Sequence, residues 1–573
     1  MEKLLNEKDI LKLKSKIIQT DEDENGIFVN VKDYGASGID IDGNDDTDPI
    51  QQAINFVTDA GGGEVYVPEG IYRINPLENS EGRGLILKDN VHFLLADNAI
   101  LKTIPNNQDN HTLLWIVNQR NITVEGGTLL GERYEHTSNT GEWGHGILIR
   151  DNAKNITIKN IKLSQFWGDG IEILSSYGAS PIDGHVEKVR PENIFIDNIS
   201  CIDNRRQGIS IVSGLNIEIT NSNFTHTNGV EPHAGIDIEP TEVGDFCKNI
   251  LIKNCIFEDN EGEGILIHSG MLMSTWQDIE NEINSKKLFN VTDVKIEDCK
   301  FNNNKRSGIS IRRKFSKNIS IDNCTFSGNG TTTNSEFEVC HESSLIFLRN
   351  CIFQKRGNLT QTAITIINAS NVYISNNKIY DLNMIIYAYN SPDIFSVNEL
   401  NNENIYINNN LLYITDGFSN NQLFNVATYD NFTISNLQFM KNYITATNPI
   451  SHTKEISLVG INGLIFKQNR IRKFNLIITI SRVNVGMLEN NCIEDIINHT
   501  ITNSPSFLFE NNLLCELNLS NELVTSDKLS TLFTYLYHHL NEVKSDKIHN
   551  HPELTSELAS EQDVLKIIED TLI

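Results

Sequence analysis

The chain has 573 residues, of which 39% are hydrophobic, with 36 glycines and only 12 prolines. This composition favours many short strands and tight turns over layers of helices. The formal net charge of −28 argues against nucleic acid as a partner, because phosphate binding requires a basic surface.

Residues 1–27 form the first predicted segment. They contain charges throughout, as in "MEKLLNEKDILKLKSKII", with a weak apolar stripe at Leu4, Leu11 and Ile18. The charges exclude both a secretory signal peptide and a membrane span, and no later stretch is apolar enough to cross a bilayer. We therefore expect a helical segment, no membrane insertion, and synthesis in the cytoplasm without a signal peptide.

The pattern of residues 28–75 predicts a strand, a loop, a helix, a turn and a further strand. In "DDTDPIQQAINFVTDAGGGEVYVPEGIYRI", Asp46 or Thr47 can cap the helix, Pro49 lies in its first turn, and three glycines at 61–63 end it. A solenoid needs a cap over its open apolar end. We interpret this module as that cap.

Two phrases recur over residues 76–520. Gly-Ile-x-Ile occurs six times, starting at Gly146, and a short strand ending at Asn recurs as in "NITIKNIKL" (155–163) and "NILIKNCIF" (249–257). One coil per repeat predicts an all-β fold, a right-handed parallel β-helix. A β-sandwich would instead show regular Asn-Gly or Asp-Gly hairpins, which are not the dominant pattern.

The Asn residues between the short strands have a structural explanation. Asn tolerates left-handed backbone at corners, and stacked Asn side chains can form hydrogen bonds along a column.

Four cysteines occupy the same position in successive repeats, namely Cys255, Cys299, Cys324 and Cys351. We interpret them as small core residues; disulfides are the weaker alternative.

Residues 521–573 change character. Leu529, Leu532, Leu536 and Leu540 follow one another at three- and four-residue steps, which predicts a short helical segment. Its apolar stripe must pack on the solenoid or on copies of itself. His549 and His551 are a weak candidate for a metal site; a polar loop is the better interpretation.

The variable positions of Gly-Ile-x-Ile locate the candidate site. Isoleucines point inward and x points outward, since side chains alternate along a strand. Stacking the copies predicts one outward column of Leu148, Glu172, Ser210, Asp237, Leu266 and Ser310. A second outward column is Arg150, Leu174, Val212, Glu239, His268 and Arg312, and the residues before the glycines include His145, Asp169 and Glu263.

Four acids in these columns are candidate catalytic residues: Asp169, Glu172, Asp237 and Glu239. Asp237 and Glu239 would be about 6.6 Å apart, and Glu172 and Asp237 about twice 4.8 Å. An inverting glycosidase holds its acid and its base about 6.5–9.5 Å apart, with a water between them. A divalent cation is a possible ligand of the same group, and no other cofactor is indicated. A single outward acid is most often only solvated.

Other residues on this face are candidates for substrate binding. They are His145, His233, His268, Arg150, Arg206, Arg312, Glu263, Trp143 and Trp167. The two tryptophans could stack on sugar rings, although loop packing is as common. A basic patch of Lys305, Arg306, Arg312, Arg313 and Lys314 could hold an anionic sugar or remain a solvated edge.

The opening module and "GEWGHGI…FWGDGIEI" resemble the pectate-lyase superfamily of β-helix proteins, which includes polygalacturonases, epimerase-like enzymes and bacteriophage tailspike depolymerases. "WGDGIEI" is similar to the polygalacturonase motif at Asp169 and Glu172. The next coil has Arg205, Arg206 and Gln207 where polygalacturonases have paired aspartates, so their mechanism does not transfer whole. The fold supports lyases, hydrolases, epimerases and binders alike.

The resemblance implies a phage tail-associated depolymerase of a host cell-surface polysaccharide, assembled as a homotrimer, located in the virion and bound to other tail proteins. Hydrolysis of glycosidic bonds is favoured, and lyase cleavage follows closely, with Arg206, His233 or Arg312 as the base. A receptor-binding tail protein without catalysis and a cellular epimerase or glycosidase of the same superfamily are the alternatives.

Overall fold

The computed structural model describes residues 27–77, 82–176, 188–242, 244–269, 290–313, 315–333, 335–357, 362–389, 402–415, 418–429, 432–448, 450–493, 496–502 and 506–510. The chain divides into two compact units, Met1–Leu514 and Cys515–Ile573. Our predictions for residues 1–26 and 521–573, including His549 and His551, lie outside the described residues.

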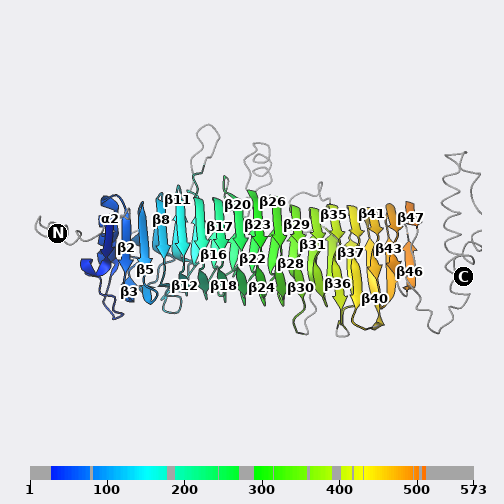
Figure 1. Cartoon of the computed structure of the whole chain (residues 1–573), viewed down its shortest axis with the longest axis horizontal. Coiled ribbons are helices and arrows are strands. Elements are labelled where there is room, and N and C mark those ends of the chain that lie inside the picture. The colour runs from blue at the N-terminus through cyan, green and yellow to red at the C-terminus, as the bar shows by residue number, and fades with distance from the viewer. Residues whose placement is uncertain are drawn as a thin grey trace, which may run out of the picture. The chain divides into compact units, whose positions relative to one another are not determined.

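The described strands form three parallel sheets, and each coil contributes one strand to each sheet (Figure 1). Sheet A consists of β1 (Ile27–Asn30), β2 (Gly63–Val67), β5 (Val91–Leu95), β8 (Arg120–Glu125), β11 (Lys154–Lys159), β14 (Glu192–Asp197), β17 (Gly214–Thr220), β20 (Phe246–Lys253), β23 (Asn290–Glu297), β26 (Ser316–Asp322), β29 (Ser344–Arg349), β32 (Ser370–Ser375), β35 (Asn402–Asn408), β38 (Ile434–Met440), β41 (Ile461–Lys467), β44 (Val485–Glu489) and β47 (Ser506–Glu510).

Sheet B consists of β3 (Gly70–Ile74), β6 (Ala99–Thr103), β9 (Thr128–Leu130), β12 (Lys162–Ser164), β15 (Ser200–Ile202), β18 (Asn223–Thr225), β21 (Ile256–Glu258), β24 (Lys300–Asn302), β27 (Thr325–Ser327), β30 (Ile352–Gln354), β33 (Lys378–Tyr380), β36 (Leu411–Ile414), β39 (Tyr443–Ala446), β42 (Arg470–Ile471) and β45 (Cys492–Ile493).

Sheet C contains the Gly-Ile-x-Ile strands. It consists of β4 (Arg83–Ile86), β7 (Asn110–Val117), β10 (Trp143–Arg150), β13 (Ile171–Leu174), β16 (Ile209–Ile211), β19 (Ile236–Ile238), β22 (Ile265–His268), β25 (Ile309–Arg312), β28 (Ser335–Cys340), β31 (Thr362–Ile367), β34 (Asn383–Ala388), β37 (Gln422–Thr428), β40 (Ile450–Val459), β43 (Phe474–Ser481) and β46 (Ile496–Thr502).

The strand register of sheet C confirms the first predicted column. Glu172 pairs with Ser210, and Ser210 pairs with Asp237. The flanking isoleucines are fully buried. The motif glycines allow neighbouring coils to approach closely, because a Cβ on Gly208 would lie 2.4 Å from the carbonyl oxygen of Gly235.

Asparagine ladders support the corners of the coils, as the sequence predicts. Along the edge of sheet A, Asn121, Asn155 and Asn193 have φ values of 57° to 59°, and each side-chain amide donates to the Asn of the preceding coil. A second ladder is buried inside the solenoid and consists of Asn377, Asn410, Asn442, Asn469 and Asn491.

The core consists of stacked apolar columns. Phe257, Phe301 and Phe326 stack with ring centroids 4.8 to 4.9 Å apart and have no exposed surface. The four cysteines at the repeated slot are buried and free, which confirms their interpretation as core residues.

The predicted capping helix is α2 (Thr47–Asp59), which follows a 3-10 turn, η1 (Val31–Tyr34), and lies beside β2 at the N-terminal end of the sheets (Figure 1). One detail differs from the prediction. Asp46 occupies the N-cap position, but its carboxylate accepts from the backbone of Ser37 and Arg73 instead of from the helix. Asp45 accepts from Thr47 in its place. No helix among the described residues is long and apolar enough to span a membrane.

Candidate functional site

Arg206 lies in the turn between β15 and β16, directly before sheet C. Its guanidinium group bridges two carboxylates: Nη1 is 3.0 Å from Asp169 Oδ2, and Nη2 is 3.2 Å from Glu239 Oε1. The Asp169 side chain has no exposed surface and the Glu239 side chain is 8% exposed. Buried carboxylates require a counter-charge, and Arg206 supplies it to both.

A His-Asp-Glu triplet lies on either side of Arg206. The first is His145, Asp169 and Glu172, and the second is Asp237, Glu239 and His268; in each, one potential ligand atom per residue lies within 4.8 Å of the others. We call these six residues with Arg206 the Arg206 cluster. Carboxylate and imidazole groups at this spacing could hold a divalent cation.

Hydrogen bonds fix the first triplet. The backbone N–H of Asp169 donates to His145 Nδ1 at 3.2 Å. A neutral His145 therefore carries its proton on Nε2, which lies 3.3 Å from Glu172 Oε2. Ser210 Oγ donates to Asp169 Oδ2 at 2.8 Å.

Similar support holds the second triplet. Gln207 Nε2 donates to Asp237 Oδ2 at 2.9 Å, and His268 Nε2 lies 3.5 Å from Asp237 Oδ1 and 3.7 Å from Glu239 Oε2. Residues that the sequence places in three different coils thus converge on one face of sheet C.

The surroundings of the carboxyl groups in the Arg206 cluster shift their pKa values in opposite directions. Burial raises the pKa of Glu172, and burial with the charge of Glu239 raises the pKa of Asp237 to about 7. Burial also opposes ionisation of Glu239, but the hydrogen bond from His268 and the charge of Arg206 lower its pKa. Burial disfavours the charged form of His268, but the charge of Asp237 outweighs this effect and raises the pKa of His268 to about 9. Carboxyl groups with opposed shifts can serve as acid and base.

One predicted distance is wrong. Asp237 and Glu239 present oxygens within 4.8 Å of each other, because both side chains turn toward His268. This is closer than the about 6.5–9.5 Å gap of an inverting pair, so that pair leaves no room for a water. Glu172 and Asp237 do lie two rungs apart, with Ser210 between them, as predicted.

Two of the other predicted binding residues, Arg312 and Arg150, form ion pairs. Arg312 Nη2 lies 3.0 Å from Glu263 Oε1 and 3.4 Å from Glu338 Oε2. Arg150 Nε lies 3.0 Å from Oδ1 of its chain neighbour Asp151, outside the Arg206 cluster. His233 lies in the turn before β19, and burial lowers its pKa.

The predicted basic patch is an array of ion pairs. Arg306 Nη2 lies 2.7 Å from Glu231 Oε1, Lys305 binds Glu261, and Arg312 binds Glu263. Lys314 lies outside the described residues. The positive charges described here are therefore largely compensated, which the spacing of basic residues in the sequence does not reveal.

The two tryptophans differ. His136 stacks on the Trp167 ring with centroids 3.9 Å apart, and the Arg205 guanidinium lies 3.6 Å from its centroid. Because both contacts are at stacking distance, they cover opposite faces and leave none for a sugar ring. The prediction of sugar stacking by Trp167 is wrong. Trp143 is 46% exposed and remains a candidate.

A buried group of one carboxylate and two imidazoles lies behind Trp167, and the repeat pattern of the sequence does not indicate it. Glu132 Oε1 lies 2.7 Å from His111 Nε2 and 3.0 Å from His136 Nδ1, and all three side chains are at most 1% exposed. The hydrogen bonds from these imidazoles lower the pKa of Glu132 to about 2 despite its burial. Glu132 and His136 lie between β9 and β10, in a segment that repeats in no other coil, so no column could identify them.

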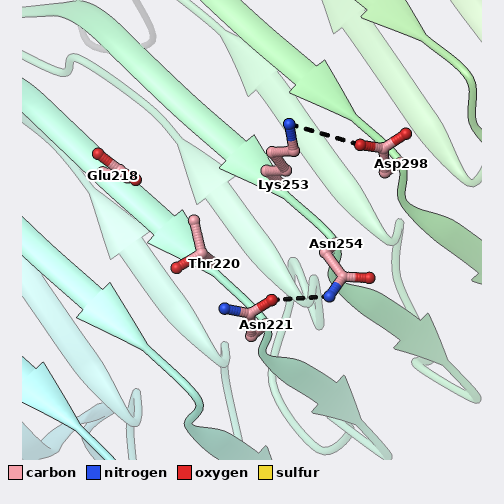
Figure 2. Close-up of a pocket in the computed structure, with 6 residues that line it drawn as sticks. All are labelled: Glu218, Thr220, Asn221, Lys253, Asn254 and Asp298. Atoms are coloured by element: carbon pink, nitrogen blue, oxygen red, sulfur yellow. Dashed lines mark hydrogen bonds and ion pairs between the residues drawn. The ribbon is translucent and has the colours of Figure 1, made fainter.

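A polar pocket lies on the outward face of sheet A, away from the Arg206 cluster (Figure 2). Its lining residues are Glu218, Thr220, Asn221, Lys253, Asn254 and Asp298. Asn254 donates to Asn221 at 2.7 Å, and Lys253 lies 3.6 Å from Asp298, so the corner ladder and an ion pair form its wall.

Three curated relatives are similar to part of the chain. The uncharacterized protein YclG of Bacillus subtilis is 30% identical over 263 residues, covering 42% of this chain and 44% of the relative. Mannuronan C5-epimerase AlgE1 of Azotobacter vinelandii is 28% identical, covering 41% and 18%. The SPbeta prophage-derived uncharacterized protein YorA of B. subtilis is 24% identical, covering 52% and 46%. The chain thus spans less than half the length of these relatives.

The chain is also similar to solved structures, among them a polysaccharide-degrading protein. It is tailspike gp49 of Acinetobacter baumannii bacteriophage Fri1, a capsular polysaccharide depolymerase, with a TM-score of 0.39 and 15% identity over 83% of this chain and 63% of that one. At this identity the likeness concerns the fold alone. The model of the right-handed β-helix region matches residues 84–287 and 279–426, and with three parallel sheets in the described residues, the chain belongs to the right-handed parallel β-helix family.

Proposed function

We propose that the chain is a carbohydrate-active enzyme that hydrolyses glycosidic bonds of a polysaccharide at the Arg206 cluster. One observation carries the proposal: Glu172 and Glu239 lie on one face, and their pKa values are displaced in opposite directions. Both side chains reach the surface, with 15% and 8% exposure. Glu172 is the general acid, and the ionised Glu239 is the general base.

The separation of these carboxyl groups leaves room for a water, as an inverting mechanism requires. Glu172 lies on β13 and Glu239 directly follows β19, two strands further along sheet C, so their backbones are about twice 4.8 Å apart, at the upper limit of the inverting range of about 6.5–9.5 Å. Glu172 protonates the leaving glycosidic oxygen while Glu239 removes a proton from an attacking water. Arg206 and His268 keep Glu239 ionised, and the hydrogen bond from Arg206 helps to fix its orientation.

Elimination is the second candidate, and the similarity to a mannuronan C5-epimerase favours it. That chemistry needs a base for the proton at C5 of a uronate. The charges of Asp169 and Glu239 raise the pKa of Arg206, and the charge of Glu263 raises that of Arg312. Each guanidinium thus retains its proton and is a poor base, which leaves His233 as the predicted base with a lowered pKa.

The biological setting remains that of the sequence prediction. A prophage-derived relative supports a phage origin, and the role of a tail protein that acts on a host cell-surface polysaccharide is part of this proposal. Assembly as a homotrimer and contact with other tail proteins belong to this proposal, and both depend on residues beyond those described.

The test follows polymer size with time for surface polysaccharides of candidate host bacteria, with end-group analysis of the products. Hydrolysis yields new reducing ends without ultraviolet absorbance, whereas elimination yields unsaturated ends that absorb. Binding without shortening would contradict an enzymatic function and favour the receptor-binding alternative.

A further inference from the structure

The outward face of sheet C contains more carboxyl groups than cationic groups. From β13 to β28, five rungs or about 24 Å, six carboxyl groups line it. They are Asp169, Glu172, Asp237, Glu239, Glu263 and Glu338. The cationic groups on this stretch are the guanidinium groups of Arg206, Arg312 and, at its edge, Arg306, together with the His268 imidazole, which lies against Asp237 and Glu239.

Each of these guanidinium groups is already engaged. Arg206 lies between Asp169 and Glu239, Arg312 lies between Glu263 and Glu338, and Arg306 binds Glu231. A carboxylate or sulfate on a sugar would have to displace a protein carboxylate from an existing ion pair. The face therefore disfavours a polyanionic ligand, because like charges would meet at carboxyl groups that are largely buried.

A second observation concerns hydrogen bonding. Within the described part of the chain, four buried side-chain oxygens of this face accept no hydrogen bond. Asp169 Oδ1 and Gln207 Oε1 are two of them, and the others have only a cationic group at longer distance: His268 Nε2 at 3.5 Å from Asp237 Oδ1 and Arg306 Nη1 at 3.8 Å from Glu263 Oε2. None of these four residues has exposed surface. Oxygens that lack a donor make a site complementary to a ligand that supplies N–H groups.

We propose that this face binds a polysaccharide with free amino sugars, whose ammonium groups lie against the carboxylates between Glu172 and Glu338. This substrate class rests on the proposed function and makes it specific. An ammonium group offers three donors and a positive charge, so it satisfies both the excess of carboxyl groups and the unused acceptor oxygens. Binding of that charge favours the ionised forms of the raised carboxyl groups.

Glu338 provides a probe that is separate from the acid–base pair. It lies on β28, three rungs beyond Asp237 in the same column, and its side chain is 16% exposed. Ser310 Oγ donates to it at 3.0 Å, and Arg312 Nη2 lies 3.4 Å away. Glu338→Gln keeps the shape, removes one negative charge and leaves Arg312 less compensated.

The experiment measures binding by titration calorimetry with three oligosaccharides of equal length: a glucosamine oligomer, its N-acetylated form and an oligouronate. It is run at mildly acidic pH, where the amino groups are charged, at low and high salt. The glucosamine oligomer is expected to bind at least about tenfold tighter than the acetylated form, with an advantage that shrinks at high salt. The oligouronate is expected to bind weakest.

Glu338→Gln is expected to weaken glucosamine binding several-fold and to leave the acetylated oligomer unchanged. Glu218→Gln is the matched control, because it removes the same charge from sheet A and is expected to change neither affinity (Figure 2). Equal binding of the charged and acetylated oligomers, or tighter binding of the oligouronate, would overturn the proposal. Binding is measured separately from hydrolysis. An absence of hydrolysis would therefore contradict the proposed function without affecting the test of amino-sugar binding.

Discussion

Nη1 of Arg206 lies 3.0 Å from Oδ2 of Asp169, a carboxylate without exposed surface. The two residues come from successive coils, and the same guanidinium group reaches Glu239 in the coil after them. The contact thus ties three coils together and determines which carboxyl groups of the face are ionised.

Replacement of Arg206 by Met should destabilise the protein by about 3–5 kcal/mol, because two buried carboxylates lose their counter-charge. The measurement is the free energy of unfolding in denaturant. Arg349→Met is the control, since Arg349 is 45% exposed and its pair with Asp322 should contribute at most about 1 kcal/mol. Equal losses in both variants would show that the Arg206 pairs are solvated.

Asp237 should make the free energy of unfolding decrease as pH rises. Its pKa is raised from 3.8 to about 7, so the folded state holds the proton more tightly than the unfolded chain. Its contribution is therefore fully present below pH 4 and is lost as pH rises through about 7. The stability of Asp237→Asn should not decrease in this way. The melting temperature of the variant, relative to that of the wild type, should therefore increase from pH 4 to pH 8. Parallel curves would mean that Asp237 is not protonated in the native protein.

The phenylalanine column should dominate the stability of the core. Phe301→Ala removes a fully buried ring that stacks on both neighbours and should cost about 3–5 kcal/mol, measured by denaturant unfolding. Phe195→Ala, at a side chain that is 47% exposed, should cost far less. Similar losses at the two positions would contradict the assignment of the core.

The buried asparagine ladder should be sensitive to single substitutions. Asn442 donates to Ile407 and Asn469 and accepts from Asn410, so Asn442→Ala leaves buried polar groups unsatisfied and should cost about 1–3 kcal/mol or more. Asn462→Ala changes an exposed Asn on β41 and should be nearly neutral in the same unfolding measurement. A neutral result at Asn442 would show that water satisfies the ladder.

The sequence was sufficient to predict the solenoid and the column that contains Glu172 and Asp237, because inward isoleucines and a close-approach glycine repeat in every coil. Alternation along a strand then fixes which side chains point outward. The prediction depended on spacing alone, and it failed where side chains reach across coils.

Arg206 and Trp167 show this limit. Both lie in turns, where no repeat fixes the side-chain direction, and both make their contacts with a different coil. Glu338 was missed because "SEFEVC" on β28 lacks the Gly-Ile-x-Ile phrase although it continues the same column. Long-range ion pairs of this kind follow from the stacking of coils and are not encoded in a local pattern.

Catalysis at the Arg206 cluster is tested most directly by the initial rate of polymer shortening, measured for Glu172→Gln, the wild type and Glu218→Gln. We expect Glu172→Gln to lose at least about 100-fold in rate, because it lacks the general acid. We expect Glu218→Gln, on sheet A, to keep the wild-type rate. Wild-type shortening that survives in Glu172→Gln would contradict the assignment of the Arg206 cluster as the catalytic centre.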